Sequence, residues 1–122
     1  MAFMKNFSSP TQRTGEIGEN LSVKYLETNG YFVKDRNFAN KYGEIDIVAQ
    51  KGDKWYFFEV KTGKKSGFIN PAENLTEAKL SKFRISVQHY CMLHHIKNYT
   101  MQGIIVLLDP LGRGDIEILD LW

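Results

Sequence analysis

The sequence predicts a single α/β domain in which a mixed β-sheet is flanked by two helices. Its 122 residues suit one domain with one hydrophobic core. Two segments, about 14–28 and 76–95, carry apolar residues at helical spacing. Residues 104–108 are wholly apolar, which is typical of a strand covered on both faces. The predicted order of elements is α-β-β-β-α-β-β, and the mixed sheet forms the centre of the domain.

The first helix is predicted to run from about Gly15 to Thr28, with Thr14, whose hydroxyl suits the role, as its N-cap. Asn29-Gly30 supplies the stop signal. Its apolar face consists of Ile17, Leu21, Tyr25 and Leu26. The preceding residues contain no long apolar core of the kind that signal peptides have. We therefore expect 1–13 to be a flexible N-terminal arm and 14–122 to be the folded domain.

Three strands follow the first helix. Residues 31–33 open the first strand, and the polar run 36–42 is predicted to turn the chain. Residues 44–50 and 55–62 are both rich in apolar and β-branched or aromatic residues, and the tight turn 51–54 separates them. These two segments are predicted to form an antiparallel hairpin.

The second helix is predicted to follow Asn70-Pro71 and to start near Thr76. Its apolar stripe consists of Leu80, Phe83, Val87, Tyr90 and Cys91. Its polar stripe consists of Lys79, Lys82, Ser86 and His89. A strand over 101–108 and a last strand over 116–121 complete the sheet.

Composition limits the classes of function. The formal net charge is +2, which permits nucleic-acid binding but does not indicate it without local clustering of basic residues. No segment approaches the roughly 18 apolar residues that a membrane span needs. We expect a cytoplasmic protein with no membrane partner. The single cysteine, Cys91, has no partner for an internal disulfide and suits a core position.

Charged residues interrupt both strands of the predicted hairpin. Asp46 lies between Ile45 and Ile47, and Glu59 and Lys61 follow the apolar run of the next strand. Strand alternation places Glu44, Asp46 and Val48 on one side and Ile45, Ile47 and Ala49 on the other. Glu59 and Lys61 share a side with Trp55 and Phe57 by the same rule. If the register brings the acidic sides together, the two carboxylates are neighbours with Cβ atoms about 5 Å apart.

Two neighbouring carboxylates require a cation, and the candidates are Lys61 and a divalent metal. Mg²⁺ prefers oxygen ligands and keeps several waters, so Asp46, Glu59 and the backbone carbonyl of Val60 would suffice. Such a metal activates water for phosphodiester hydrolysis, and a nearby ammonium orients that water. The alternative is an ion-pair network at the rim of a sheet. Single charges within apolar runs on two adjacent strands favour a functional site.

The order of these motifs resembles the PD-(D/E)xK nuclease superfamily. More closely, the sequence resembles the YraN-like uncharacterised family, which is itself similar to archaeal Holliday-junction resolvases. The similarity covers about residues 15–90. The matching segments are Gly15-Glu16-Ile17-Gly18-Glu19, Tyr25-Leu26, Gly30-Tyr31, Arg36-Asn37, Gly43-Glu44-Ile45-Asp46, Phe58-Glu59-Val60-Lys61, Asn70-Pro71, Lys79 and Arg84.

The resemblance implies a restriction-endonuclease or resolvase-like fold in which Asp46 and Glu59 bind Mg²⁺ or Mn²⁺ and Lys61 assists catalysis. It also implies that Glu19 completes the site, either directly or through water. Glu16 is instead well placed to interact with the helix N-terminus. Glu44 is either a further ligand or a solvated acid at the rim.

The leading hypothesis is a metal-dependent endonuclease that acts on DNA, with a branched structure such as a Holliday junction as substrate if the likeness extends that far. Four lysines are candidates for phosphate contacts: Lys64, Lys65, Lys79 and Lys82. Junction resolution needs two cuts, which implies a homodimer, and the last strand with Leu119, Leu121 and Trp122 is a candidate contact. The alternative is a catalytically silent domain that binds nucleic acid or a protein partner.

Overall fold

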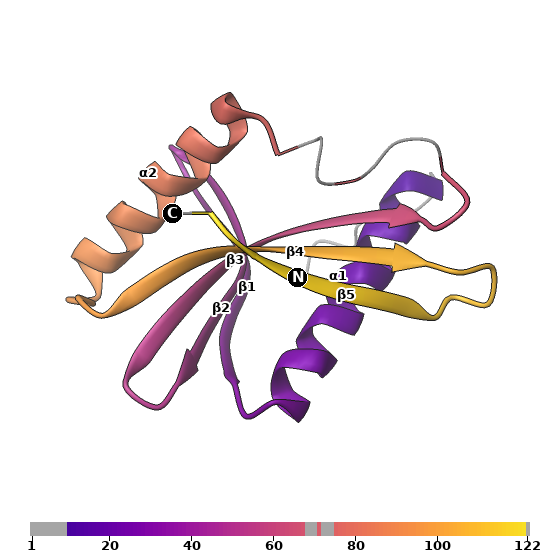
Figure 1. Ribbon diagram of the computed structural model, residues 1–122. Coiled ribbons are helices and arrows are strands. Elements are labelled where there is room, and N and C mark those ends of the chain that lie inside the picture. The colour runs from indigo at the N-terminus through magenta and orange to yellow at the C-terminus, as the bar shows by residue number, and fades with distance from the viewer. Residues whose placement is uncertain (1–9, 68–70, 72–74, 122) are drawn as a thin grey trace, which may run out of the picture.

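The computed structural model describes residues 10–67, 71 and 75–121 and has the predicted element order (Figure 1). The elements are α1 (Pro10–Thr28), β1 (Phe32–Asn40), β2 (Gly43–Lys51), β3 (Lys54–Lys64), α2 (Glu77–Leu93), β4 (Tyr99–Leu108) and β5 (Gly114–Asp120). Most of the predicted N-terminal arm, residues 1–9, lies outside the described residues, as does Trp122. No helix in the described part of the chain is long and apolar enough to cross a membrane.

The five strands form one mixed sheet in the order β1-β2-β3-β4-β5. β3 and β4 are parallel, whereas the other three neighbouring pairs are antiparallel. The parallel pair follows from the connection, because a chain must cross over before it can re-enter a sheet in the same direction, and α2 lies in that crossover. The prediction of a mixed sheet with this element order is confirmed.

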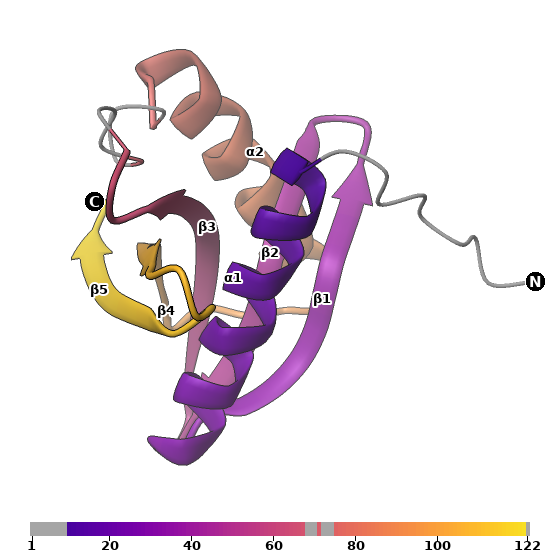
Figure 2. The same cartoon turned by 90° about the vertical axis from the view of Figure 1, so that its right-hand side faces the viewer.

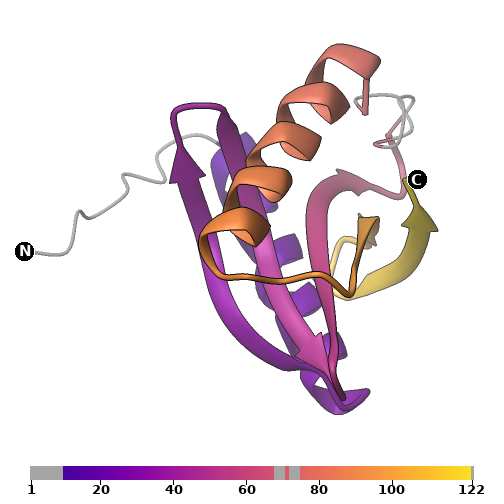
Figure 3. The ribbon, with the colours of Figure 1, turned by 90° about the vertical axis from the view of Figure 1, so that its left-hand side faces the viewer.

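The two helices cover opposite faces of the sheet (Figures 2 and 3). Each helix closes its own hydrophobic cluster. The α1-side cluster consists of Leu26, Ile47, Ala49, Phe58, Ile104, Val106 and Leu108. The α2-side cluster consists of Ile45, Val48, Phe57, Phe83, Val87, Tyr90, Cys91 and Met101. The inner strands are apolar on both sides because both of their faces are covered.

Two predictions about the first part of the chain are wrong. The first helix begins at Pro10, four residues before Thr14, and proline is favoured at the start of a helix because the first N–H groups have no intrahelical acceptor. The polar run 36–42 is not a turn throughout, because β1 continues to Asn40. β1 is an edge strand, so its partly exposed faces accept polar residues that sequence periodicity assigns to a loop.

Helix α2 begins as predicted, since Thr76 is its N-cap and accepts a hydrogen bond from the Lys79 N–H at 3.4 Å. It ends at Leu93, two residues earlier than predicted. Ser86, assigned to the polar stripe, is instead fully buried, and its hydroxyl donates to Asn40 Oδ1 at 3.1 Å. The prediction failed there because a hydrogen-bond partner on β1 makes burial of the hydroxyl tolerable.

The last strand is less exposed than its sequence indicated. β5 is the second edge of the sheet, yet Leu119 and Leu121 are half-buried. Leu121 packs against the α2-side cluster, and its N–H donates to the Met101 carbonyl at 3.2 Å. Leu121 therefore contributes to the fold itself, while a dimer contact through this strand stays a prediction.

Candidate active site

A cleft of about 880 Å³ opens between α1 and the strands β1, β2 and β3. The cleft is lined by Gln12, Gly15, Glu16, Glu19, Asn20, Arg36, Asn37, Glu44, Asp46, Glu59, Val60 and Lys61. All four residues predicted as catalytic, Glu19, Asp46, Glu59 and Lys61, are among them. The fold therefore brings together, in one concave polar site, side chains from one helix and two strands.

The cleft exists because the ladder between β2 and β3 ends early. Backbone pairing runs from Lys51 and Lys54 at the turn to Ile47 and Phe58, and it stops there. Figures 2 and 3 show β3 bending away from the β1–β2 hairpin beyond this point. The separation of two neighbouring strands produces the opening in which the acids lie.

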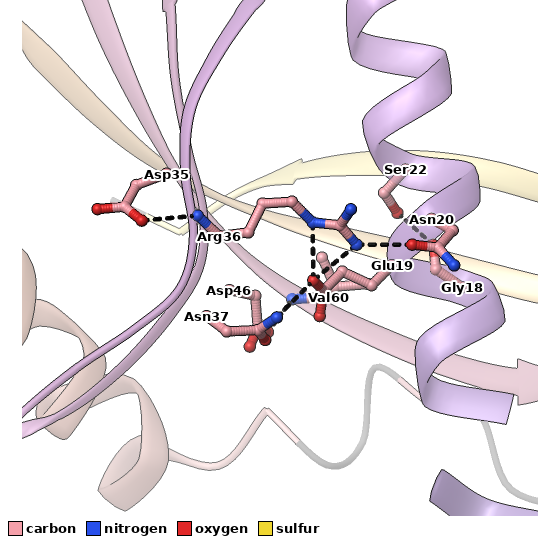
Figure 4. Close-up of polar contacts among 9 residues, drawn as sticks. All are labelled: Gly18, Glu19, Asn20, Ser22, Asp35, Arg36, Asn37, Asp46 and Val60. Carbon is pink, nitrogen blue, oxygen red and sulfur yellow. Dashed lines mark hydrogen bonds and ion pairs between the residues drawn. The ribbon is translucent and has the colours of Figure 1, made fainter. Parts of the chain in front are cut away.

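Asp46 replaces the missing strand partner at the point of separation. The Val60 N–H donates to Asp46 Oδ2 at 2.7 Å, where a continuous antiparallel ladder would offer a β2 carbonyl (Figure 4). The N–H and C=O of one strand residue leave the same edge of the strand, so the Val60 carbonyl also points toward the opening. The Asp46 side chain thus gives the Val60 N–H a hydrogen-bond acceptor at a point where the two strands are separated.

Asp46 and Glu59 are electrostatic neighbours in the cleft, although the backbone pairing of β2 with β3 ends one residue before them. The observed pairs, continued by one residue beyond Ile47 and Phe58, put Asp46 opposite Glu59, and both side chains line the cleft. Strict alternation fails nearby, because Ile45 packs with Val48 in the α2-side cluster and not with Ile47. The strand is irregular at Asp46.

β1 is irregular at the same level as Asp46 on β2. The β1–β2 partners run from Arg36 with Ile47 directly to Phe38 with Ile45, and they omit Asn37 and Asp46. Asn37 has φ of 52°, in the left-handed region, which asparagine tolerates better than most non-glycine residues. The unpaired position on β1 therefore coincides with a left-handed backbone conformation.

Burial makes the Asp46 and Glu59 carboxyl groups harder to ionise than usual. Burial raises the pKa of Asp46 to about 6, although the hydrogen bond from Val60 lowers it. Burial raises the pKa of Glu59 to about 7, and the neighbouring Asp46 charge adds to this effect. Lys61 opposes the rise, with its Nζ 3.4 Å from Glu59 Oε1. The single ammonium does not fully compensate the two acids.

Glu19 is held by residues from β1 (Figure 4). Arg36 donates to Glu19 Oε1 from Nε at 3.1 Å and from Nη2 at 3.0 Å, and Asn37 Nδ2 donates to the same oxygen at 2.9 Å. Arg36 Nη2 also donates to Asn20 Oδ1 at 2.7 Å. The helix glutamate is therefore fixed by a three-donor arrangement, which Figure 4 shows bridging α1 and β1.

Sequence reasoning missed Arg36 and Asn37 as site residues. They lie in the polar run that was assigned to a turn, and the resemblance contained them without giving them a role. A signal was nevertheless present, because arginine is the usual bidentate partner of carboxylates and asparagine tolerates left-handed backbone. Among the acids left open, Glu16 and Glu44 both line the cleft and are exposed.

Gly18 allows α1 to lie close to β3. The residue is buried in the helix, and an added Cβ would overlap the Thr62 side chain. The Ser22 hydroxyl, also fully buried, donates to the Gly18 carbonyl at 2.8 Å. This close approach brings the next residue, Glu19, to the cleft, and a larger residue at position 18 would push the helix away.

The donor set suits a hard divalent cation only in part. Five carboxylates and two cationic side chains line the cleft: Glu16, Glu19, Glu44, Asp46 and Glu59, with Arg36 and Lys61. Carboxylate oxygens beside a backbone carbonyl are ligands of the kind that Mg²⁺ takes, and a small protein shell suffices because Mg²⁺ keeps several waters. Across the described residues, no group of three or more His, Cys, Asp or Glu side chains is arranged to hold a metal. A metal here would thus have two protein carboxylates and waters.

The four lysines predicted to contact DNA do not line the cleft. Lys64 and Lys65 lie at the end of β3 and just beyond it, and both are exposed. Lys65 Nζ lies 2.8 Å from Asp115 Oδ2. Lys79 and Lys82 are exposed on α2, which covers the opposite face of the sheet from α1 (Figures 2 and 3).

Comparison with known proteins gives a consistent result. A UPF0102 protein of Fervidobacterium nodosum is 39% identical over 113 residues, which cover 92% of this chain and 83% of the relative. A UPF0102 protein of a Sulfurovum species is 46% identical over 109 residues, which cover 87% and 89% of the two chains. The crystal structure of SSO0001 is a remote match, with TM-score 0.39, 18% identity, and coverage of 92% of this chain and 52% of that one.

The two relatives are named for their family alone and carry no stated activity or substrate. The model of the uncharacterised protein family UPF0102 matches residues 18–116, a range that includes α1 from Gly18 onward and β5 as far as Ile116. The YraN-like resemblance seen in the sequence agrees with this match. The chain belongs to the uncharacterised protein family UPF0102.

Proposed function

We propose that this protein is a divalent-metal-dependent nuclease that hydrolyses phosphodiester bonds in DNA. The observation that carries the proposal is the early end of the β2–β3 ladder, where Asp46, Glu59 and Lys61 line one cleft. Perturbed acids grouped in a cleft mark functional sites more often than structural ones. The resemblance of the motif order to PD-(D/E)xK nucleases supports the same function.

The chain's own residues divide the work. Asp46, Glu59 and the Val60 carbonyl would hold Mg²⁺ or Mn²⁺, and Glu19 would join through a water molecule. When bound, the metal would supply Lewis acidity toward a phosphoryl oxygen and an acidified water. Lys61, whose Nζ is 3.4 Å from Glu59 Oε1, would orient the attacking water and offset the charge that develops on the phosphate.

The proposed substrate is branched DNA such as a Holliday junction, by likeness to resolvases. Two coordinated cuts would then require a homodimer, and cytoplasmic DNA would be the target. The four exposed lysines, Lys64, Lys65, Lys79 and Lys82, would contact phosphates outside the cleft. Phosphate contacts fix orientation on the nucleic acid and carry no sequence information, so no base preference is part of the proposal.

The second candidate is a catalytically silent nuclease-fold domain that binds nucleic acid or a protein partner. The specific observation in its favour is that, among the described residues, no three or more His, Cys, Asp or Glu side chains are arranged so that they could hold one metal ion. In that case Lys61 pairs with Glu59, and Asp46 serves only to accept the Val60 N–H. The two candidates differ in whether the carboxylates take up a metal.

The discriminating experiment measures Mg²⁺ and Mn²⁺ binding by calorimetry at about pH 8, where both central acids are ionised, for the wild type and Asp46→Asn. The nuclease proposal requires uptake by the wild type and loss in the variant. Cleavage of four-way, flap, duplex and single-stranded DNA is then compared for the wild type, Lys61→Ala and Lys97→Ala, an exposed lysine outside the cleft. Equal residual activity in the wild type and Lys61→Ala would indicate a contaminant, and absent metal uptake at millimolar concentration would favour the silent domain.

A further inference from the structure

The left-handed residue on β1 lies directly at the candidate active site. Asn37 and His95 are the non-glycine residues with positive φ in the described part of the chain. His95 is exposed and lies just after α2, where a helix commonly ends in such a conformation. Asn37 instead lies within a strand, at the position where β1 loses its pairing with Asp46 on β2. No turn or helix end accounts for the conformation there.

The side chains explain the conformation better than the backbone does. The break turns the Asn37 amide toward α1, where its Nδ2 donates to Glu19 Oε1 at 2.9 Å. Arg36, the preceding residue, donates to the same oxygen from Nε and Nη2. In a regular strand these consecutive side chains would point to opposite faces. The left-handed residue is what allows both to reach a single carboxylate.

The burial of the paired side chains indicates which group is the fixed one. The Glu19 side chain is 14% exposed, whereas that of Arg36 is 39% exposed. A half-exposed arginine does not need a buried partner for its own solvation, whereas a largely buried carboxylate does need donors. The network therefore serves to hold Glu19.

We propose that Asn37 is a positioning residue which, with Arg36, fixes the Glu19 carboxylate beside Asp46 at the cleft, and that the left-handed break in β1 exists to make this possible. The inference rests on the proposed function, because it assigns Glu19 to the outer shell of the metal. Residues that orient metal ligands typically change metal affinity or activity about 10- to 100-fold when they are removed. The Asn37 amide acts on the site through its hydrogen bond to Glu19.

The test uses Asn37→Gly, because glycine adopts the same backbone conformation without strain and lacks only the amide. His95→Gly is the matched control, since it makes the same change at the other left-handed position, outside the cleft. Arg36→Lys is the second variant, because lysine keeps the charge but loses the two-pronged geometry. It keeps the test informative if Asn37→Gly does not fold.

Two readouts separate the positioning role from the proposed function. The first is the NMR signal of the Arg36 Nε–H, which reports the contact with Glu19 without any metal. In Asn37→Gly we expect faster exchange and a shifted signal. The second is Mn²⁺ affinity together with the metal dependence of DNA cleavage, which we expect to weaken about 10- to 100-fold and to recover partly at high metal concentration.

The outcomes are distinct. An unchanged Arg36 signal together with wild-type metal affinity in Asn37→Gly would overturn the positioning role, even if the wild type is an active nuclease. A wild type that takes up no metal would overturn the proposed function, while the Arg36 signal would still decide whether Asn37 fixes Glu19. If His95→Gly lost as much Mn²⁺ affinity as Asn37→Gly, the loss would be a general response to a glycine substitution, and this result would also overturn the inference.

Discussion

Replacing Glu59 by glutamine probes the cost of keeping two buried carboxylates in one cleft. Burial and the nearby Asp46 raise the pKa of Glu59 from 4.5 to about 7. The folded protein therefore binds a proton more readily than the unfolded chain between about pH 4 and pH 7. The bound proton stabilises the folded protein in full at pH values below the pKa that Glu59 has in the unfolded chain. This stabilisation is lost as the pH rises through the pKa that Glu59 has in the folded protein. The wild type should become less stable from about pH 5 to pH 8.

The magnitude follows from the size of the pKa change. At about 1.36 kcal/mol for each pKa unit, ionising Glu59 in the folded protein costs roughly 2 to 3 kcal/mol between pH 5 and pH 8. Glutamine keeps the shape of the side chain but never ionises. It also removes the partner of Lys61, a partly exposed pair worth about 1 kcal/mol or less. The unfolding free energy of Glu59→Gln should thus be roughly 1 to 3 kcal/mol higher than that of the wild type at pH 8. At about pH 5 the two proteins should have the same unfolding free energy.

The assay is urea unfolding of both proteins at about pH 5 and pH 8, with and without Mg²⁺. Glu117→Gln is the control, because Glu117 is exposed on β5. Mg²⁺ at 100 times its dissociation constant should add about 2.7 kcal/mol to the wild type at pH 8 and much less to Glu59→Gln. The reasoning is refuted if the difference in unfolding free energy between wild type and Glu59→Gln is the same at both pH values.

Three further outcomes are expected. Gly18→Ala should lower the unfolding free energy in urea by about 1 to 3 kcal/mol, and Thr62→Gly should partly restore it, whereas additive losses would exclude the predicted overlap. Asp46→Asn keeps an acceptor for the backbone N–H of β3 and removes an ionisation that burial disfavours, so at pH 8 it should be at least as stable as the wild type, whereas Asp46→Ala should be less stable than Asp46→Asn by about 1 to 3 kcal/mol. Replacing Lys79 and Lys82 by alanine should reduce the slope of log affinity for DNA against log salt by roughly 0.9 for each phosphate that these lysines neutralise, and an unchanged slope would contradict their role.

The fold was predictable where periodicity and turn chemistry agree. The β2–β3 hairpin follows from apolar segments on both sides of a Gly52 turn, and that glycine has φ of 63°. The start of α2 follows from Thr76, a residue with a direct hydrogen-bonding reason to cap a helix. β1 was predicted only in part, because an edge strand has no need of a continuous apolar pattern. The apolar pattern of a segment reflects how far its side chains are buried. Prediction from this pattern is therefore weakest for a segment that is only partly buried.

The candidate site was predictable to a different extent. Asp46, Glu59 and Lys61 stand out because charges break apolar runs, and the structure places all three in the cleft. The contributions of Arg36 and Asn37 were not predictable from such a pattern, since they depend on a backbone break within a polar strand. Contacts that join β1 to α1 are set by tertiary packing, and spacing along one element carries no information about them.

The acids in the hairpin are compatible with a stable sheet because the sheet stops pairing where they occur. A continuous ladder would hold Asp46 and Glu59 face to face as like charges with little access to water, which is destabilising. Separating the strands relieves this repulsion but leaves the Val60 N–H without a β2 carbonyl as acceptor. Asp46 Oδ2 supplies that acceptor at 2.7 Å. The Asp46 carboxylate thus stabilises the β3 backbone at the opening in which this carboxylate itself lies. The same opening allows Lys61 and solvent to reach Glu59.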